Sequence, residues 1–119
     1  MAHPETFTIN TLGFLGVRAE SVLDLPGLIG AVYGLDGLIV HATDVGPDFY
    51  RLESGLAGEL FQRLVHLRLP TACVLPDWNA HGERFAQLAS EHARHPQVRF
   101  VHTDEDALLW LAGQLGPDS

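Results

Sequence analysis

The sequence predicts a single α/β domain with a mainly parallel central sheet, an N-terminal antiparallel hairpin and helical cover. Short apolar runs that are typical of buried strands alternate with longer segments whose apolar residues recur at helical spacing, mostly across short connections. Two β-like runs precede the first helix, so the expected order is β-β-α-β-α-β-α-β-α. We expect one domain over residues 1–119, with an ordered core of about residues 6–115.

The first third of the chain is expected to supply the hairpin and the first helix. The runs TFTI and FLGVRA, within residues 6–20, are β-like and are separated by a turn at residues 10–13. Ser21 or Asp24 then caps a helix with Pro26 near its start, which ends around residues 34–37. Its apolar residues are Leu25, Leu28, Ile29 and Val32. The next run, LIVHA, is typical of a buried parallel strand.

Residues 49–65, FYRLESGLAGELFQRLV, contain the most informative helix start. Ser54 and Gly55 close an irregular polar segment, residues 43–53, and open a helix that ends near Arg68. We expect a broad apolar face made of Leu56, Ala57, Leu60, Phe61, Leu64 and Val65. The solvent side would carry Glu59, Gln62, Arg63 and His66.

The last third of the chain repeats the alternation. Residues 71–75 are a predicted buried strand, and Asp77 or Asn79 caps a helix that ends before Pro96 and carries Phe85, Leu88 and Ala89. Residues 98–102 form the last predicted strand. Thr103 and Asp106 then make a capping-box pattern at the start of a final helix, residues 104–115, which residues 116–117, Gly-Pro, close.

The composition excludes several classes of function. The net charge is −8 and the seven basic residues are dispersed arginines, so we expect no nucleic-acid and no membrane partner. The absence of lysine rules out a Walker-type phosphate loop and a lysine Schiff base. Apolar runs of about four residues are too short for a membrane span. Residues 1–5 lack a signal-peptide core and Cys73 has no intrachain partner, so we expect a cytoplasmic protein without a cofactor.

Several segments carry a family resemblance: LIGAVYG, GLIVHATDVGPDFYRLESGLAGELFQRLV, TACVLPDW, Glu91 with Arg94, and RFVHTDEDALLWL. Together they cover about 90 residues, are densest in SGLAGEL, and resemble the uncharacterised bacterial family called domain of unknown function 4180. That family has no settled biochemical role. Arg51 stands where we expect an acidic residue in the family, and His92-Ala93 where we expect Ser-Asn. The resemblance therefore implies no function at those positions.

A wider resemblance concerns the element order and the strand–loop–Ser–Gly–Leu–helix segment. Both are similar to the STAS domains of anti-sigma-factor antagonists, small non-enzymatic proteins whose switch serine precedes a glycine at this helix start. The resemblance implies a STAS-like fold and a regulatory role for Ser54. STAS proteins usually have an acidic residue two positions before the serine, whereas this chain has Leu52 there and Glu53 next to the serine.

The candidate regulatory or anion-binding residues are Ser54, Gly55 and Glu53. A hydroxyl at a helix start can cap free backbone N–H groups, and these groups and the helix dipole would also favour a phosphate attached to it. We favour the unmodified cap over a phosphosite. For Gly55 and Gly58 we favour close helix–sheet approach over a ligand contact. The candidate interaction surface consists of Asp48, Arg51, Glu59, Gln62 and Arg63.

Other chemistry has weaker support. His92 and His95 have the i, i+3 spacing of two metal ligands, but a structural zinc site needs four, and the other histidines and Cys73 fall on other elements. Ser54 lacks the Gly-x-Ser-x-Gly elbow of a hydrolase. Three carboxylates before it could bind a cation but more often solvate a loop, namely Asp44, Asp48 and Glu53.

These observations predict a non-enzymatic regulatory or protein-interaction module of STAS-like type. Its partner would be another protein, its working surface would be residues 43–53, Ser54 and the exposed side of the following helix, and a homodimer is compatible with it. The competing interpretation is a small-molecule or anion-binding protein, or an enzyme, that uses the helix start at Ser54. A deep polar pocket beside Ser54 would favour the second interpretation, and a shallow convex surface the first.

Overall fold

Four short parallel strands form the centre of the molecule. The structure is a computed structural model that describes residues 7–115. The strands lie in chain order, β1-β2-β3-β4, and each neighbouring pair is parallel. Their bounds are Ile9–Thr11 for β1, Gly37–His41 for β2, Thr71–Val74 for β3 and Val98–Val101 for β4.

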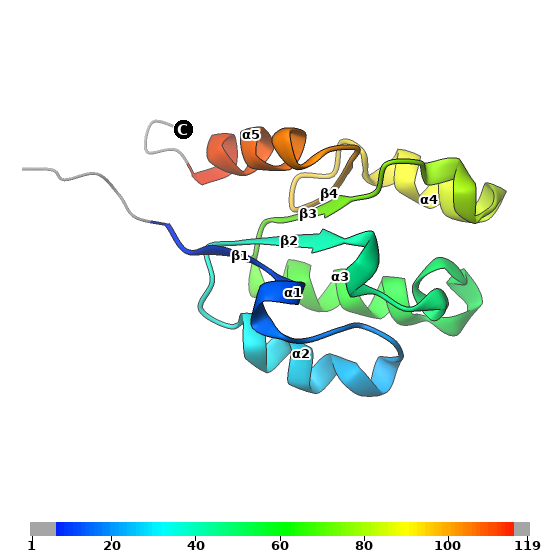
Figure 1. The fold of residues 1–119 in the computed structure, drawn as a ribbon, viewed down its shortest axis with the longest axis horizontal. Helices are drawn as coiled ribbons and strands as arrows, with labels where there is room; N and C mark the ends of the chain where they lie inside the picture. The colour runs from blue at the N-terminus through cyan, green and yellow to red at the C-terminus, as the bar shows by residue number, and fades with distance from the viewer. Residues whose placement is uncertain (1–6, 116–119) are drawn as a thin grey trace, which may run out of the picture.

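Within the described residues, five α-helices cover both faces of this sheet. They are α1 Leu12–Leu15, α2 Leu25–Val32, α3 Leu56–Leu67, α4 Glu83–His92 and α5 Asp104–Leu115. Helices α2 and α3 lie on one side of the sheet and α5 on the other (Figure 1). Helix α4 belongs to the α2–α3 side, because its Phe85 and Ala89 join the core cluster there.

Burial on both faces explains the uninterrupted apolar runs of the strands. Leu38 and Val40 belong to the larger core cluster beneath α2, α3 and α4, whereas Ile39 belongs to a smaller cluster beneath α5. In β3, Cys73 lies in the larger cluster and Val74 in the smaller one. Successive strand side chains point to opposite faces, so a strand covered on both sides is apolar at every position. The predicted α/β domain with buried parallel strands is confirmed.

The predicted N-terminal antiparallel hairpin is wrong. Strand β1 pairs with β2 in parallel, with Ile9 opposite Gly37, and the chain then enters α1 rather than a second strand. Local chemistry explains the difference: the Thr11 hydroxyl accepts a hydrogen bond from the backbone N–H of Phe14 at 3.0 Å and caps α1. Gly16, at φ 77°, ends the helix. The observed order is therefore β-α-α-β-α-β-α-β-α.

Only one isolated bridge remains of the second predicted strand among the described residues. Ala19 pairs with Val45 in parallel. Residue 6, where the first β-like run was expected to begin, lies outside the described residues, as do residues 116–117 of the predicted C-terminal stop.

The remaining elements agree closely with the prediction. Ser21 and Asp24 form a capping box around a 3₁₀ turn that leads into α2, and Arg68 ends α3 in the left-handed conformation at φ 57°. The Asp77 carboxylate accepts from the backbone N–H of Asn79 at 3.0 Å, although it caps a 3₁₀ turn, Trp78–His81, rather than α4 itself. These boundaries follow from local hydrogen bonds, which the sequence displays directly.

The apolar face predicted for α3 needs one correction. Leu56, Leu60 and Leu64 are fully buried, whereas Val65 is 37% exposed. Val65 follows Phe61 by four residues but lies at the edge of the stripe, turned away from the row of leucines.

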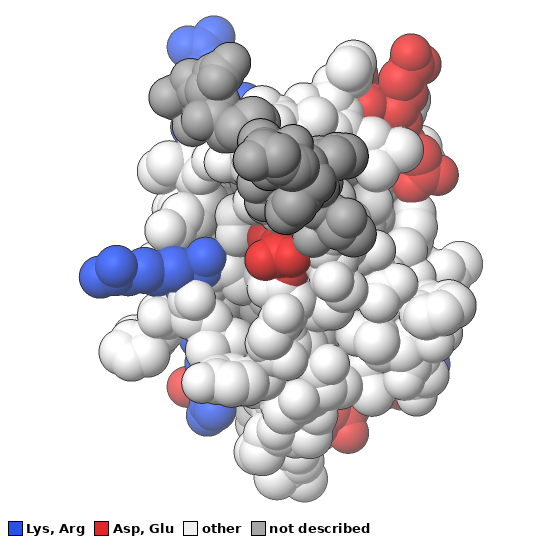
Figure 2. Space-filling model, turned by 90° about the vertical axis from the view of Figure 1, so that its left-hand side faces the viewer, with Lys and Arg blue, Asp and Glu red and all other residues white. Residues whose placement is uncertain are grey.

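The strands begin on the left-hand side of Figure 1, which is the side that Figure 2 turns toward the viewer. Where the undescribed residues leave this side visible, charged side chains are separated by uncharged surface, and the blue ones do not gather into one basic patch (Figure 2). In the described part of the chain, no helix has both the length and the apolar character that crossing a membrane requires.

Candidate functional site

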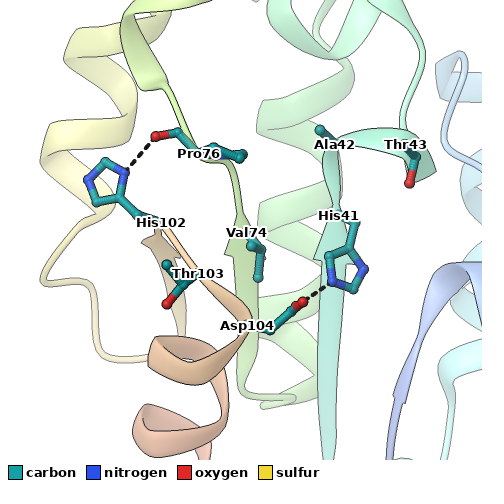
Figure 3. A pocket seen from close by; sticks show the side chains of 8 residues that line it. All are labelled: His41, Ala42, Thr43, Val74, Pro76, His102, Thr103 and Asp104. Carbon is teal, nitrogen blue, oxygen red and sulfur yellow. Dashed lines mark hydrogen bonds and ion pairs between the residues drawn. The ribbon is translucent and has the colours of Figure 1, made fainter.

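The carboxyl ends of the strands form the opposite edge of the sheet, and a crevice opens there. Strand β3 leads to α4 on the face of the larger core, whereas β4 leads to α5 on the other face. Connections that leave neighbouring parallel strands toward opposite faces separate from each other, and ligands of open α/β sheets bind in the space between them. The crevice has a volume of about 450 Å³. Figure 3 shows the side chains that line it. Its lining residues are His41, Ala42, Thr43, Val74, Pro76, His102, Thr103 and Asp104.

His41 and Asp104 form the polar centre of this crevice. His41 ends β2 and Asp104 begins α5, and the imidazole Nε2 lies 2.5 Å from the carboxylate Oδ1 (Figure 3). A carboxylate can only accept a hydrogen bond, so Nε2 is the donor. The backbone N–H of His41 donates to Asp44 Oδ2 at 2.9 Å, and the imidazole Nδ1 lies 3.7 Å from the same oxygen. One imidazole is thus flanked by an exposed carboxylate and a buried one.

His102 supplies a second imidazole to the crevice. Its Nδ1 donates to the carbonyl oxygen of Pro76 at 3.1 Å (Figure 3), and its ring stacks on Trp78 with centroids 4.2 Å apart. Among the described residues, Nε2 of this ring makes no hydrogen bond. Thr103 is occupied differently: its hydroxyl accepts the backbone N–H of Asp106 at 3.1 Å and caps α5, which is the Thr103 half of the predicted capping box.

The lining combines an apolar middle with polar ends. Val74 and Pro76 lie between the His41–Asp104 pair and His102 (Figure 3). This is the usual composition of a small-molecule pocket, where apolar surface supplies affinity and a few polar groups fix orientation. No arginine lines the crevice, and the first turn of α5 carries three acidic residues, from Asp104 to Asp106. These carboxylates offset the positive end of the helix dipole, so the crevice disfavours anions.

Ser54 lies elsewhere, in the segment that joins β2 to α3. Its hydroxyl donates to the carbonyl oxygen of Asp48 at 2.6 Å and accepts the backbone N–H of Leu56 at 3.2 Å. Helix α3 begins at Leu56 and its N-cap residue is Gly55, so Ser54 lies one residue before the cap position at which it was predicted, although its hydroxyl still satisfies one free N–H of the first turn. Both the donor and the acceptor function of this half-buried hydroxyl are therefore used within the protein.

Gly55 and Gly58 do not allow a close helix–sheet approach, and that expectation is wrong. Among residues 7–115, a Cβ added at either position would have no heavy atom of a neighbouring element within 4 Å. Gly55 instead adopts φ 79°, a left-handed conformation that favours glycine between the 3₁₀ turn Leu52–Ser54 and α3. Gly58 is an exposed residue inside α3.

The predicted interaction residues fall into two groups on either side of this helix start. Arg51 lies 3.4 Å from Asp48 and 3.8 Å from Glu53, and with Glu53 it lines a hollow of about 310 Å³. On α3, Arg63 lies 3.8 Å from Glu59. Glu59, Gln62 and Arg63 line a separate hollow of about 400 Å³. The charges of the proposed surface thus pair largely with one another, and such exposed pairs contribute little stability.

One protein-family profile covers both candidate sites. The profile described as "Domain of unknown function (DUF4180)" matches residues 15–111. The chain belongs to this family. No curated protein and no solved structure matches the chain, so the likeness to STAS domains gains no support from either comparison. The matched segment of this DUF4180 domain includes His41, Ser54, His102 and Asp104.

The two histidines considered as metal ligands bond to the backbone of the DUF4180 domain. His95 Nδ1 accepts the backbone N–H groups of Gln97 at 3.0 Å and Val98 at 3.1 Å, and His92 Nδ1 donates to the carbonyl of Val98 at 3.0 Å. Burial, then the neighbouring His92 and Arg99, lower the pKa of His95. Within residues 7–115, no three histidine, cysteine or acidic side chains are close enough to hold a metal ion.

Cys73 is buried in β3 and carries no reactive thiolate. Burial raises the pKa of this thiol to about 12. A thiol is nucleophilic only when ionised, so Cys73 is part of the core and not a catalytic group.

The crevice is not among the predicted sites, because its residues come from three separate segments of the chain. His41 lies in the run LIVHA and ends β2, His102 follows the run VRFV, and Asp104 begins the next helix. A usable signal was present: polar residues directly after buried parallel strands share one edge of the sheet. The predicted site, by contrast, is one contiguous segment around Ser54.

Proposed function

We propose that this DUF4180 domain binds a small molecule in the crevice at the carboxyl ends of β2, β3 and β4. One observation carries the proposal: the connections after β3 and β4 diverge to opposite faces of the sheet, and the crevice there has the His41–Asp104 pair as its polar centre. Small-molecule binding is the competing interpretation of the sequence, and the crevice supports it at His41 and Asp104 in place of Ser54.

The chemistry of the lining restricts the class of ligand. Asp104 can accept a hydrogen bond on the oxygen that His41 leaves free, whereas Nε2 of His102 points away from the His41–Asp104 pair in Figure 3. Val74 and Pro76 offer apolar contact between them. A small neutral or cationic molecule with a donor group at one end and an apolar body fits this pattern, whereas a phosphate or carboxylate would meet the acidic first turn of α5. The His41–Asp104 pair could also transfer a proton if the bound molecule reacts.

The experiment is a binding screen followed by two substitutions. A library of small amines, amides and alcohols, with phosphates and carboxylates as a contrasting set, is added to isotope-labelled protein while backbone resonances are recorded. We expect hits from the first set that shift the resonances of His41, His102 and Thr103. Asp104→Asn and His41→Gln should each weaken such a hit at least about tenfold, which is about 1.4 kcal/mol.

Glu105→Gln is the matched control, because this residue follows Asp104 on α5, is exposed and does not line the crevice. It should bind like the unmodified protein. Hits that shift resonances only elsewhere, or equal binding by the Asp104 variant, would overturn the proposal.

A second candidate function is protein recognition by the surface around Ser54, the non-enzymatic regulatory role of STAS-like type. The supporting observation is the hydrogen bond from Ser54 to the carbonyl of Asp48. A phosphate on that hydroxyl would remove the donor, release the carbonyl and add negative charge beside Glu53. The segment that carries Arg51 would then rearrange, which gives a partner protein two distinguishable states to recognise.

Ser54 variants test this second function against a partner recovered from the native host. Ser54→Asp should change the affinity at least about tenfold, while Ser54→Ala, which loses the hydrogen bond without adding charge, should stay within about threefold of the unmodified protein. Equal affinity for all three proteins would contradict a charge-dependent switch. Turnover lost in Ser54→Ala would favour an enzyme instead.

The cellular setting is part of the proposal. We propose a cytoplasmic protein without a bound cofactor, and no nucleic-acid or membrane partner, because the net charge of −8 repels polyanions and anionic lipid surfaces. The dispersed arginines visible in Figure 2 support the same proposal.

A further inference from the structure

We propose that the outward face of α5, together with the adjacent end of β4, binds a second copy of this chain through antiparallel pairing of the two α5 helices. This surface is separate from the small-molecule crevice, and its test uses different residues.

Helix α5 has apolar residues on both its inner and its outer side. Ala107 and Leu111 are fully buried against the sheet, yet Leu108 is 53% exposed and Leu109 is 66% exposed. A helix at the surface of a globular protein normally has one apolar stripe and a polar outer face. The exposed leucines of α5 therefore leave apolar surface that pairing with another helix would bury.

Opposite charges lie at the two ends of this face. Glu105 and Asp106 occupy the exposed first turn of α5. At the other end, Arg99 of β4 donates from Nε to the carbonyl of His95 at 3.3 Å and holds its guanidinium 5.2 Å from the ring of Trp110. None of these three charged side chains forms an ion pair within the described residues. The face is therefore negative at its start and positive beside its second half.

When two copies of α5 pack in opposite directions, the negative start of each face lies opposite the positive second half of the other. A two-fold axis between Leu108 and Leu109 would bring Asp106 of each copy to the level of Leu111 in the other, about one helical rise of 1.5 Å from Trp110. Asp106 would then lie beside the Arg99 that Trp110 holds, and symmetry would form this contact twice. A parallel arrangement would instead place like charges together, which is unfavourable.

The size of the face predicts a weak, reversible dimer. A helix of 12 residues is about 18 Å long. Specific protein interfaces usually bury about 800 Å² on each partner, which is more than one short helix supplies. We therefore expect an equilibrium that depends on protein concentration rather than a permanent dimer.

Sedimentation velocity over a wide range of protein concentrations tests the proposal. The unmodified protein should shift from monomer to dimer as concentration rises, and Leu109→Glu should weaken this association at least about tenfold. Leu23→Glu is the matched control, because Leu23 is 86% exposed but precedes α2 on the other side of the sheet. It should associate like the unmodified protein. A monomer at every concentration, or association that Leu109→Glu leaves unchanged, would overturn the proposal.

Charge reversal tests the antiparallel register. Asp106→Arg and Arg99→Glu should each weaken association, and the double variant should recover most of it because the two charges exchange places. Arg94→Glu, an exposed reversal at the end of α4, should have no effect. The cap of α5 survives in Asp106→Arg, since Thr103 accepts the backbone N–H of residue 106, and circular dichroism would verify folding of each variant. A double variant no better than the single ones would contradict this register.

Discussion

The crevice at the carboxyl edge of the sheet and the helix start at Ser54 use their polar groups in opposite ways. The Ser54 hydroxyl gives its proton to Asp48 and accepts the N–H of Leu56, so it has little capacity left for a ligand. In the crevice, by contrast, the Asp104 side chain is 67% exposed and pairs with a histidine that is itself 31% exposed. A polar group whose hydrogen bonds are satisfied internally supports the fold, whereas a group that remains accessible in a concave site can recognise a ligand.

The largest expected change in the free energy of unfolding tests whether the helix that follows Ser54 is part of the buried core. Leu60 is fully buried in α3, the helix that Ser54 precedes. Leu60→Ala should lower the free energy of unfolding by about 2–5 kcal/mol, because burial is lost and a cavity remains. Gln62→Ala, on the exposed side of the same helix, should change it by less than about 0.5 kcal/mol. Denaturant titration measures both, and comparable losses would contradict the assignment of faces.

The next prediction separates the two glycines at this helix. Gly55→Ala should destabilise the protein by about 1–2 kcal/mol, because an alanine at φ 79° is strained. Gly58→Ala should stabilise it by up to about 1 kcal/mol, since that position is helical and its Cβ meets no neighbouring element. Thermal and denaturant unfolding would show opposite signs. The same sign at both positions would mean that the backbone at Gly55 differs from the structure.

A third prediction compares the two sites directly. Ser54→Ala should cost about 1 kcal/mol of stability, because it removes the hydroxyl that bridges Asp48 and Leu56. Asp104→Asn should cost less, since exposed pairs contribute about 0–1 kcal/mol, while its effect on ligand binding should be large. Unfolding midpoints measured beside binding constants would test this contrast. A loss of stability at Asp104 that exceeds the loss at Ser54 would mean that the His41 pair is mainly structural.

The smallest expected effect concerns His95. Its Nδ1 accepts backbone N–H groups, so this side chain, like the Ser54 hydroxyl, hydrogen-bonds within the protein. The folded protein lowers the pKa of His95 below its ordinary value of 6.5, so the unfolded chain binds more protons as pH falls below that value. Stability should therefore decrease as pH falls from about 6.5 toward the lower folded pKa. Unfolding midpoints across this range should show a shallower acid-side decline in His95→Gln than in the unmodified protein. An unchanged pH profile in the variant would contradict a role for His95 in this decline.

The quality of the sequence-based predictions depended on how local the deciding interaction was. The capping box at Ser21, the cap at Thr103 and the end of α3 at Arg68 were readable because each depends on residues within one turn. The hairpin failed because FLGVRA is apolar enough for a strand. In the structure the Thr11 cap makes part of this run helical, and β1 pairs with β2 instead.

The candidate site residues show the same contrast between local and long-range interactions. Ser54 was found because its hydrogen bonds are local. The pair of His41 and Asp104 was not predicted, because 63 residues separate them and the sequence around one residue does not indicate contact with the other.

The sequence by itself therefore determined the alternation of buried strands and helices, their approximate bounds and the acidic, lysine-free surface. Those features follow from side-chain periodicity, local capping and composition. Only the tertiary structure decided the direction of β1, the face on which α5 packs and hence the crevice between the connections of β3 and β4. The physical reason is that strand direction and helix placement depend on the mutual burial of segments far apart in the chain, for which local periodicity carries no information.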